Sequence, residues 1–150
     1  MHMKIAVIGI GSNSVRMLVC EINGPEMRRL RREREGTRLF AGLDEKLNLS
    51  RESMASSCQA VKAMADSART EGCEAIHLFA TSATRDAANQ ADFSAMLKER
   101  AGLTLEICSG DKEAALSFLG ATDGGDSGVI DIGGGSTEIV AGCGMDIRCA

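Results

Sequence analysis

Apolar runs separated by turn residues predict three strands at the start of the chain. The runs cover 4–10 and 15–22, and a third strand is expected over 27–38. The segment GSNS separates the first two runs, and NGP at 23–25 separates the second from the third. Because these connections are short, the three strands are expected to form an antiparallel meander.

Beyond residue 50 the apolar positions recur at helical rather than strand spacing. A helix is predicted over 50–70, with Ser50 as its N-cap and Gly72 as its stop. Further elements are expected as a strand at 75–81, a helix at 93–100 with Asp92 as cap and Gly102 as stop, a strand at 103–108 and a helix at 111–121. The resulting order, βββαβαβα, predicts an α/β fold whose later strands are parallel and joined by right-handed crossovers.

The opening strand–turn–strand pattern occurs a second time near the end of the sequence. The segments VIGIGSNSVRMLV and VIDIGGGSTEIV share the pattern I-x-I-G-x-x-S, with Ile8 matching Ile130. The glycine-rich segment 122–128 between the two copies is expected to be a hinge. We therefore predict a first domain over 1–121 and the start of a second, similar domain over 129–150. Because this second copy ends after its first hairpin, we expect the chain to be part of a longer protein.

Both turns of this repeat have the composition of a phosphate-binding loop. Glycines let several backbone N–H groups converge on one point, and serine or threonine hydroxyls add hydrogen-bond donors. Asp131 lies beside the second turn, and carboxylates are ligands that Mg²⁺ prefers. The alternative is that both turns are ordinary tight hairpins. The candidate loop residues are Gly11, Ser12, Asn13 and Ser14 in the first turn, and Gly133, Gly134, Gly135, Ser136 and Thr137 in the second.

Charge and composition narrow the class of protein. The formal net charge of −4 argues against general nucleic-acid binding. The basic segment MRRLRREREGTR is the exception: its simpler interpretation is a solvated edge strand whose charges discourage aggregation, and the alternative is a guide for a polyanionic substrate. No apolar run reaches the roughly 18 residues that cross a membrane. The six cysteines form no CxxC pair, so a reduced, cytoplasmic protein is expected.

Four motifs between Gly9 and Val140 together resemble one protein family. They read GIGSNSVRMLV, ATSATRDAAN, SGDKEAALSFLGA and VIDIGGGSTEIV, and they are similar to the exopolyphosphatase/guanosine pentaphosphate phosphohydrolase (Ppx/GppA phosphatase) family. The resemblance implies a ribonuclease H-like fold of the actin/Hsp70/sugar-kinase superfamily, which has the same βββαβαβα order. It also implies hydrolysis of a terminal phosphoanhydride or 5′-phosphate of polyphosphate or guanosine pentaphosphate, with Mg²⁺ in a cleft between two domains.

The same resemblance assigns roles to three acidic residues. Glu113 in SGDKEA matches the family's catalytic glutamate, which activates the attacking water. A carboxylate in the first turn of a helix is kept ionised and can act as a general base, although an exposed first-turn glutamate is the simpler interpretation of this residue alone. Asp131 and Glu138 match acidic residues of the second phosphate motif. They are expected to organise metal or water, and Glu138 is counted with Glu113 as catalytic.

Two arginines are expected near phosphate by this resemblance. Arg85 in ATSATRDA resembles a phosphate-facing arginine, and a guanidinium can pair two phosphate oxygens at once. The alternative for Arg85 is a salt bridge with Asp86 or Glu113. Arg16 follows the first turn and is expected to face either phosphate or solvent.

The first motif departs from the family pattern, which begins with an aspartate. Gly9 stands at that position, which corresponds to Asp131 in the internal repeat. Loss of this carboxylate is expected to weaken Mg²⁺ binding, so the hypothesis is that Gly9→Asp raises activity. The chain alone is expected to turn over little substrate. Its last hairpin is expected to promote a homodimer by exposing apolar residues, namely Val129, Ile130, Ile132, Ile139 and Val140.

Two other functions stay open at this point. An ATP-dependent kinase or ATPase would share the fold, but it would need an adenine pocket from outside this segment. A catalytically impaired module that binds phosphate-rich ligands would account for Gly9. The segment SGDKEA favours the hydrolase over the kinase.

Overall fold

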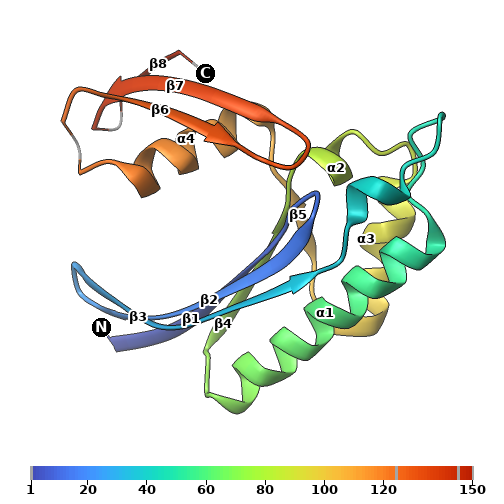
Figure 1. Cartoon of the computed structure of the whole chain (residues 1–150). Coiled ribbons are helices and arrows are strands. Elements are labelled where there is room, and N and C mark those ends of the chain that lie inside the picture. Colours follow the sequence, from blue (N-terminus) through green and yellow to red (C-terminus); the bar gives the residue numbers. More distant parts are fainter. Residues whose placement is uncertain (1, 124, 145, 150) are drawn as a thin grey trace.

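A mixed five-stranded sheet forms the centre of the first part of the chain (Figure 1). The computed structural model describes residues 2–123, 125–144 and 146–149. The first three strands pair antiparallel and the next two run parallel to the first, as predicted. The strands are β1 (His2–Ile10), β2 (Ser14–Asn23), β3 (Glu26–Gly36), β4 (Ala75–Ala80) and β5 (Leu105–Ile107), in the spatial order β3-β2-β1-β4-β5. The charged strand β3 is therefore an edge strand, which the simpler interpretation of its sequence anticipated.

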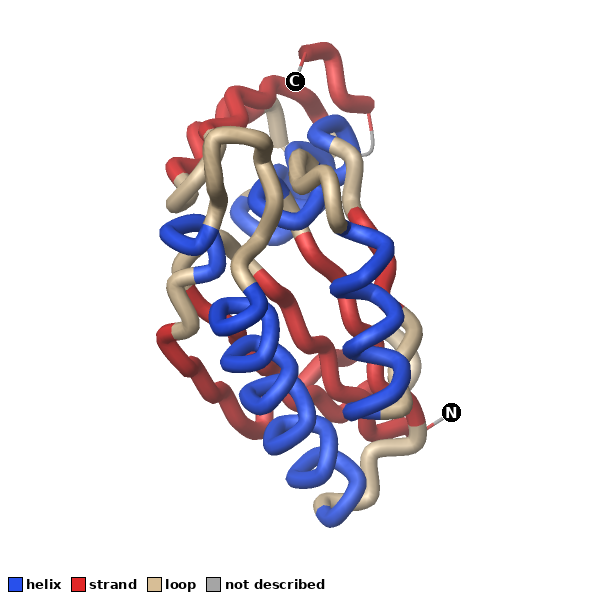
Figure 2. The backbone as a smooth tube through the Cα atoms, turned by 90° about the vertical axis from the view of Figure 1, so that its right-hand side faces the viewer, coloured by secondary structure: helices blue, strands red, loops and turns tan. Residues whose placement is uncertain are grey.

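Two long helices cover one face of this sheet. They lie side by side over the strands, as Figure 2 shows. Alternate residues of β1, namely Ala6, Ile8 and Ile10, are buried on this face and join the core with side chains such as Val61 and Phe93. The helices are α1 (Arg51–Thr70) and α3 (Gln90–Ala101), with two short ones that the sequence analysis did not predict, η1 (Leu39–Gly42) and α2 (Ser82–Arg85).

The helix ends follow the predicted signals with one exception. Ser50 caps α1 and accepts a hydrogen bond from the Ser53 backbone, and Gly102 ends α3 with a φ of 70°. The prediction that Asp92 caps α3 is wrong, because the helix begins earlier and Asn89 holds the cap position. The Asn89 side chain is bonded instead to the backbone of Leu49, which ties α3 to the preceding loop. No helix in the described ranges is long and apolar enough to span a membrane.

The last part of the chain forms a second, smaller sheet that lies across from the first (Figure 1). It contains β6 (Ser127–Ile132), β7 (Thr137–Cys143) and β8 (Asp146–Cys149), paired antiparallel as a meander like β1 to β3. Helix α4 (Gly110–Ala121) packs on this second sheet through Ala114 and Phe118, which contact Val140. The predicted boundaries had grouped this helix with residues 1–121. Those domain boundaries stay a prediction, but α4 packs on the second sheet, whose strands follow α4 in the chain.

Candidate phosphate-binding site

The two glycine turns are closed by the same backbone hydrogen bond. The Gly11 N–H donates to the Ser14 carbonyl at 3.0 Å, and the Gly133 N–H donates to the Ser136 carbonyl at 2.9 Å. These four residues correspond to one another in the internal repeat. The repeat read from the sequence is therefore also a repeat of local structure, with one copy at the end of β1 and the other at the end of β6.

The two turns meet each other in space. A Cβ built on Gly135 would lie 2.5 Å from the Ser12 hydroxyl oxygen and 3.0 Å from that of Ser82, and one built on Gly134 would meet the Asn13 side chain. A side chain at either position would force the facing Ser12, Ser82 or Asn13 side chains to shift, so the two glycines favour this close approach. Ser12 and Ser82 also share a buried hydrogen bond of 3.1 Å. The structure thus brings the two predicted loops to one place, although nothing in the sequence showed that they touch.

The segment after β3 is hydrogen-bonded to the backbone of the first turn. The backbone N–H groups of Thr37 and Arg38 both donate to the Asn13 carbonyl at 3.1 Å, and the Phe40 N–H donates to the Ser12 carbonyl at 2.8 Å. Arg38 adopts a φ of 49°, an uncommon conformation for a residue other than glycine. The sequence analysis had placed this segment at the end of a strand and missed its contact with the turn.

Glu113 and Arg85 form an ion pair beside the turns. Arg85 Nη1 donates to Glu113 Oε2 at 3.0 Å and to the Cys108 carbonyl at 3.1 Å, and Arg85 Nε lies 3.5 Å from Asp86 Oδ1. Both salt bridges considered for Arg85 are therefore present. Burial opposes the charge of Arg85, but the hydrogen bond to Glu113 and the nearby charges, including that of Glu138, raise its pKa above the ordinary value. Arg85 and Ser82 belong to the same short helix α2, so this ion pair is joined to the turns through one element.

The other two predicted acidic residues lie opposite each other on the second hairpin. Asp131 of β6 pairs with Glu138 of β7 in the register, so both side chains leave the same face of the sheet. That face packs on α4, where the Ser117 hydroxyl is hydrogen-bonded to Asp131 Oδ2. Glu138 is only 8% exposed. Buried carboxylates that face an arginine are typical of a site with a function, although structural ion pairs produce the same pattern.

These acidic residues do not form a preformed metal site. In the part of the chain that the structure describes, no group of three or more His, Cys, Asp or Glu side chains is placed to hold a metal ion. Gly9 offers no carboxylate, and a Cβ at this position would lie 2.8 Å from Cζ of Phe79. The ring of Phe79 thus takes up the space where a side chain at position 9 would begin. The Mg²⁺ site therefore stays a prediction.

The remaining predicted residues are more exposed. Asn13 is exposed within the first turn. Arg16 is exposed just after it, and the Arg16 Nε donates to the Ser14 hydroxyl at 3.3 Å. Thr137, at the start of β7, is also exposed. Thr84 of α2 was missed from the sequence. Its hydroxyl is buried and has no hydrogen-bond partner among the described residues, although it stands beside Arg85 in a motif that had been singled out.

Comparison with known proteins finds a matching family model and solved structures with a similar fold. The model of the Ppx/GppA phosphatase family matches residues 18–150. The Aquifex aeolicus member of the Ppx/GppA protein family shares 28% identity at a TM-score of 0.86, covering 99% of this chain and 50% of its own. An exopolyphosphatase-like protein shares 31% identity at a TM-score of 0.87, and the match covers 94% of this chain and 45% of that protein. An exopolyphosphatase from Cytophaga hutchinsonii shares 26% identity at a TM-score of 0.88, covering 96% and 48%.

The chain spans about half the length of these solved structures, which it matches over almost its whole length. The agreement in topology confirms the predicted ribonuclease H-like α/β fold, with an additional strand, β8, after the expected hairpin. Since the family model covers most of the chain and the structural match covers nearly all of it, the protein belongs to the Ppx/GppA phosphatase family.

Proposed function

We propose that this chain carries the phosphate-binding turns and the general base of a phosphatase that removes terminal phosphate from inorganic polyphosphate, guanosine pentaphosphate or both. Family membership supports a phosphatase. The observation that carries the proposal is the Arg85–Glu113 ion pair beside two touching glycine turns. It combines an anion-binding cation, a carboxylate base and two loops with the composition of phosphate sites.

In this mechanism Glu113 is the general base. Arg85 holds Oε2 of this carboxylate, and Oε1 has no hydrogen bond to any described residue. Oε1 accepts the proton of a water whose oxygen forms a bond to the terminal phosphorus. The bridging P–O bond breaks at the same time, and the shortened chain leaves with the bridging oxygen. Arg85 neutralises charge on the phosphate, since a guanidinium pairs well with phosphate oxygens.

Glu113→Gln tests the role of the base. The amide keeps the shape of the side chain but cannot take the proton, so phosphate release by the full-length protein should fall by about 10² to 10⁴-fold. Asp111→Asn is the matched control, because Asp111 is an exposed acidic residue in the same first turn of α4. We expect this control to keep its activity. Unchanged release by Glu113→Gln would rule out the proposed base.

Both substrates and magnesium belong in the same experiment. Release of phosphate from polyphosphate and from guanosine pentaphosphate, each measured across a magnesium titration, separates the two substrate classes. The metal prediction requires that release rise with magnesium and that Asp131→Asn shift the titration to higher concentration. Full activity in the presence of a chelator would contradict it.

Gly9 and Phe79 favour a second candidate, a module that binds phosphate-rich ligands without turnover. The position that carries an acidic residue in the second copy of the repeat is here a glycine covered by an aromatic ring. Binding of polyphosphate without release by the full-length protein would select this candidate. Because the Phe79 ring fills the space at position 9, Gly9→Asp is combined with Phe79→Leu. The double variant should then release more phosphate than Phe79→Leu alone, and equal release by the two would argue against this candidate.

A further inference from the structure

Strand alternation gathers four arginines on one face of the first sheet. In the register, Arg16 of β2 lies between Gly9 of β1 and Arg34 of β3. Directly opposite residues of antiparallel strands share a face. The residues that follow this rule on the same face are Arg16, Arg29, Arg32 and Arg34, here named the arginine track.

An irregularity in the pairing places Arg29 in this set. The register shifts between Val19 and Cys20, so that Leu18 pairs with Arg32 but Cys20 pairs with Arg29, and Leu30 is the extra residue. Without this shift, regular alternation would have placed Leu30 instead of Arg29 on the face of Arg32 and Arg34. A bulge of this kind redirects the side chains that follow it.

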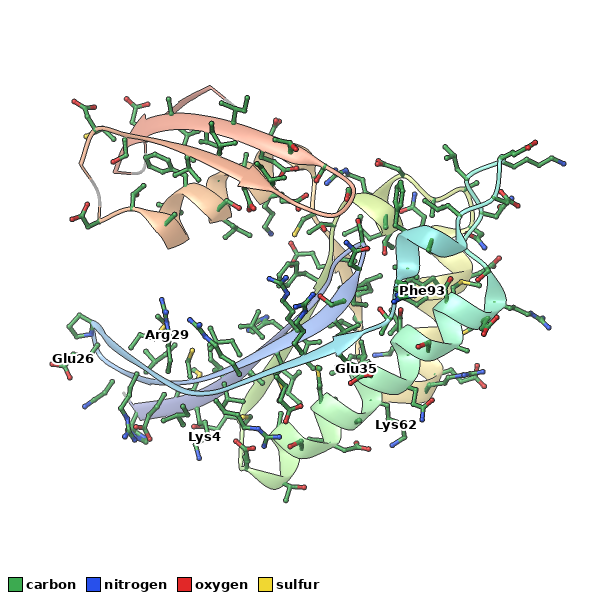
Figure 3. All side chains as sticks on the ribbon, viewed as in Figure 1. Lys4, Glu26, Arg29, Glu35, Lys62 and Phe93 are labelled. Carbon is green, nitrogen blue, oxygen red and sulfur yellow. The ribbon has the colours of Figure 1, made fainter. Side chains whose placement is uncertain are left out.

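The track lies on the face that the long helices leave open. Its neighbours in β1, such as Val7, alternate with the residues buried under α1 and α3. Figure 3 shows Arg29 pointing from the sheet toward the side on which α4 lies, whereas Lys4 points the other way. A pocket of about 340 Å³ lies on the same side, between β1, β4, β5 and α4, with Phe79 and Leu116 in its lining.

The acidic residues of these strands are on the opposite face. Glu33 and Glu35 pair with Met17 and Val15, which are buried on the helix side. Arg31 points to that side as well and forms salt bridges with Glu33 and Glu71. The carboxylates of β2 and β3 thus lie on the helix side of the sheet, where they cannot neutralise the track.

The track lacks counter-charges. The side chains of Arg29, Arg32 and Arg34 make no ion pair or hydrogen bond with any residue in the described ranges, and the Arg16 side chain is bonded only to the Ser14 hydroxyl. Arg16 and Arg34 are also directly opposite each other, and like charges in this position destabilise a sheet. Such an arrangement is stabilised when an anion binds it.

We propose that the arginine track binds an extended inorganic polyphosphate chain and leads its end to the two glycine turns. From Arg34 to Arg29 the row spans about 13 Å at roughly 3.3 Å per residue, because their partners Arg16 and Cys20 are four residues apart in β2. This length suits a chain of phosphates better than a single phosphate group. Arg16 joins the row to the first turn. Nucleic acid is less suited, because the rings of Phe79 and His77 lie on β4, away from the arginines of β3, and offer little stacking for bases along the row. The inference rests on the proposed function only in one respect, namely that the end of the polyphosphate points toward the two glycine turns.

Fluorescence anisotropy of labelled long-chain polyphosphate tests the proposal. It measures the affinity of the polyphosphate for this protein at several salt concentrations. Arg29→Gln/Arg32→Gln removes two charges of the track and touches no predicted catalytic residue. The affinity should fall about tenfold or more, and the slope of log affinity against log salt should decrease by about two. Tripolyphosphate is too short to follow the row, so its binding should change little.

The matched control, Arg28→Gln/Arg51→Gln, removes the same charge from places off the track. Arg28 is on the other face of β3, and Arg51 is at the start of α1. An equal loss of affinity in the control, or no loss in the track variant, would overturn the proposal. Equally tight binding of a single-stranded RNA at the same salt would overturn its specificity for polyphosphate. The measurement involves no turnover, so it can fail or succeed independently of Glu113→Gln. Thermal melting shows that each variant is folded.

Discussion

At the scale of single residues, the contact between Gly9 and Phe79 distinguishes this chain from its own second copy. The two residues are neighbours in the parallel pairing of β1 and β4. At the corresponding place in the second sheet, Asp131 has room and a hydrogen-bonding partner in Ser117. A carboxylate at position 9 therefore requires the ring of Phe79 to move first. Position 79 is as much a part of this site as position 9.

A double-mutant cycle tests this coupling. Gly9→Ala should lower the free energy of unfolding by about 1 kcal/mol, because the new methyl group overpacks against the ring. In a Phe79→Leu background the same substitution should be neutral or stabilising, since alanine is otherwise better than glycine in a strand. Urea denaturation of the four proteins measures both values. Additive effects would show that the ring does not restrict this position.

At the scale of elements, the two turns depend on close approach. Gly135→Ala should push the second turn away from Ser12 and Ser82 and reduce stability by about 1 kcal/mol or more. Gly120→Ala is the control, because a Cβ at this position in α4 meets nothing and alanine should stabilise the helix by about 0.5–1 kcal/mol. Opposite signs of the two effects in thermal unfolding are expected. Equal effects would show that the turns tolerate separation.

Asp44 organises the loop before α1 and makes its stability depend on pH. Its carboxylate accepts hydrogen bonds from the backbone of Asn48 and Lys46. The bond from the Asn48 backbone is the largest cause that lowers the pKa of Asp44. Because the folded pKa is lowered, this stabilisation is fully present above the ordinary aspartate pKa of about 3.9 and is lost as pH falls through the folded value.

Asp44→Asn should therefore lower the melting temperature at pH 7, and its difference from the unsubstituted protein should shrink as the pH falls below about 4. Glu45→Gln, at the exposed neighbouring position, is the control and should behave like the unsubstituted protein throughout. Melting followed by circular dichroism over this pH range provides the measurement. A difference that stays constant with pH would contradict a role for the charged carboxylate.

At the scale of the whole molecule, one face of the second sheet is apolar and uncovered. Ile130 is 66% exposed, Ile132 77% and Ile139 60%, whereas Val140 on the opposite face is buried against α4. The expected exposure of this hairpin is thus confirmed for three isoleucines, and it is wrong for Val140 because α4 covers that face. A contiguous apolar surface of this kind promotes association.

The chain is expected to self-associate through this face, as a homodimer. Sedimentation velocity over a range of concentrations should show an increase in average mass, and Ile130→Lys/Ile139→Lys should abolish it. Met27→Lys, which also replaces an exposed apolar residue, is the control and should leave association unchanged. A monomer at all concentrations would refute the expectation.

The sequence by itself determined the order of the elements, the antiparallel meander and the internal repeat. These features depend on local signals: apolar periodicity, the caps at Ser50 and Gly102, and the glycine turns. The resemblance of four sequence motifs to one family identified Glu113 and Arg85 as candidates. The periodicity, cap and turn signals can be recognised in the sequence because each depends on residues only a few positions apart.

Only the tertiary structure decided how these parts meet. It placed α4 on the second sheet, joined Arg85 to Glu113, and brought Gly135 against Ser12. It also decided which arginines of β3 share a face, because the extra residue Leu30 breaks the alternation between Arg29 and Arg31. Each outcome depends on pairing between segments far apart in the chain. Such pairing is set by packing and register, which no local pattern in the sequence contains.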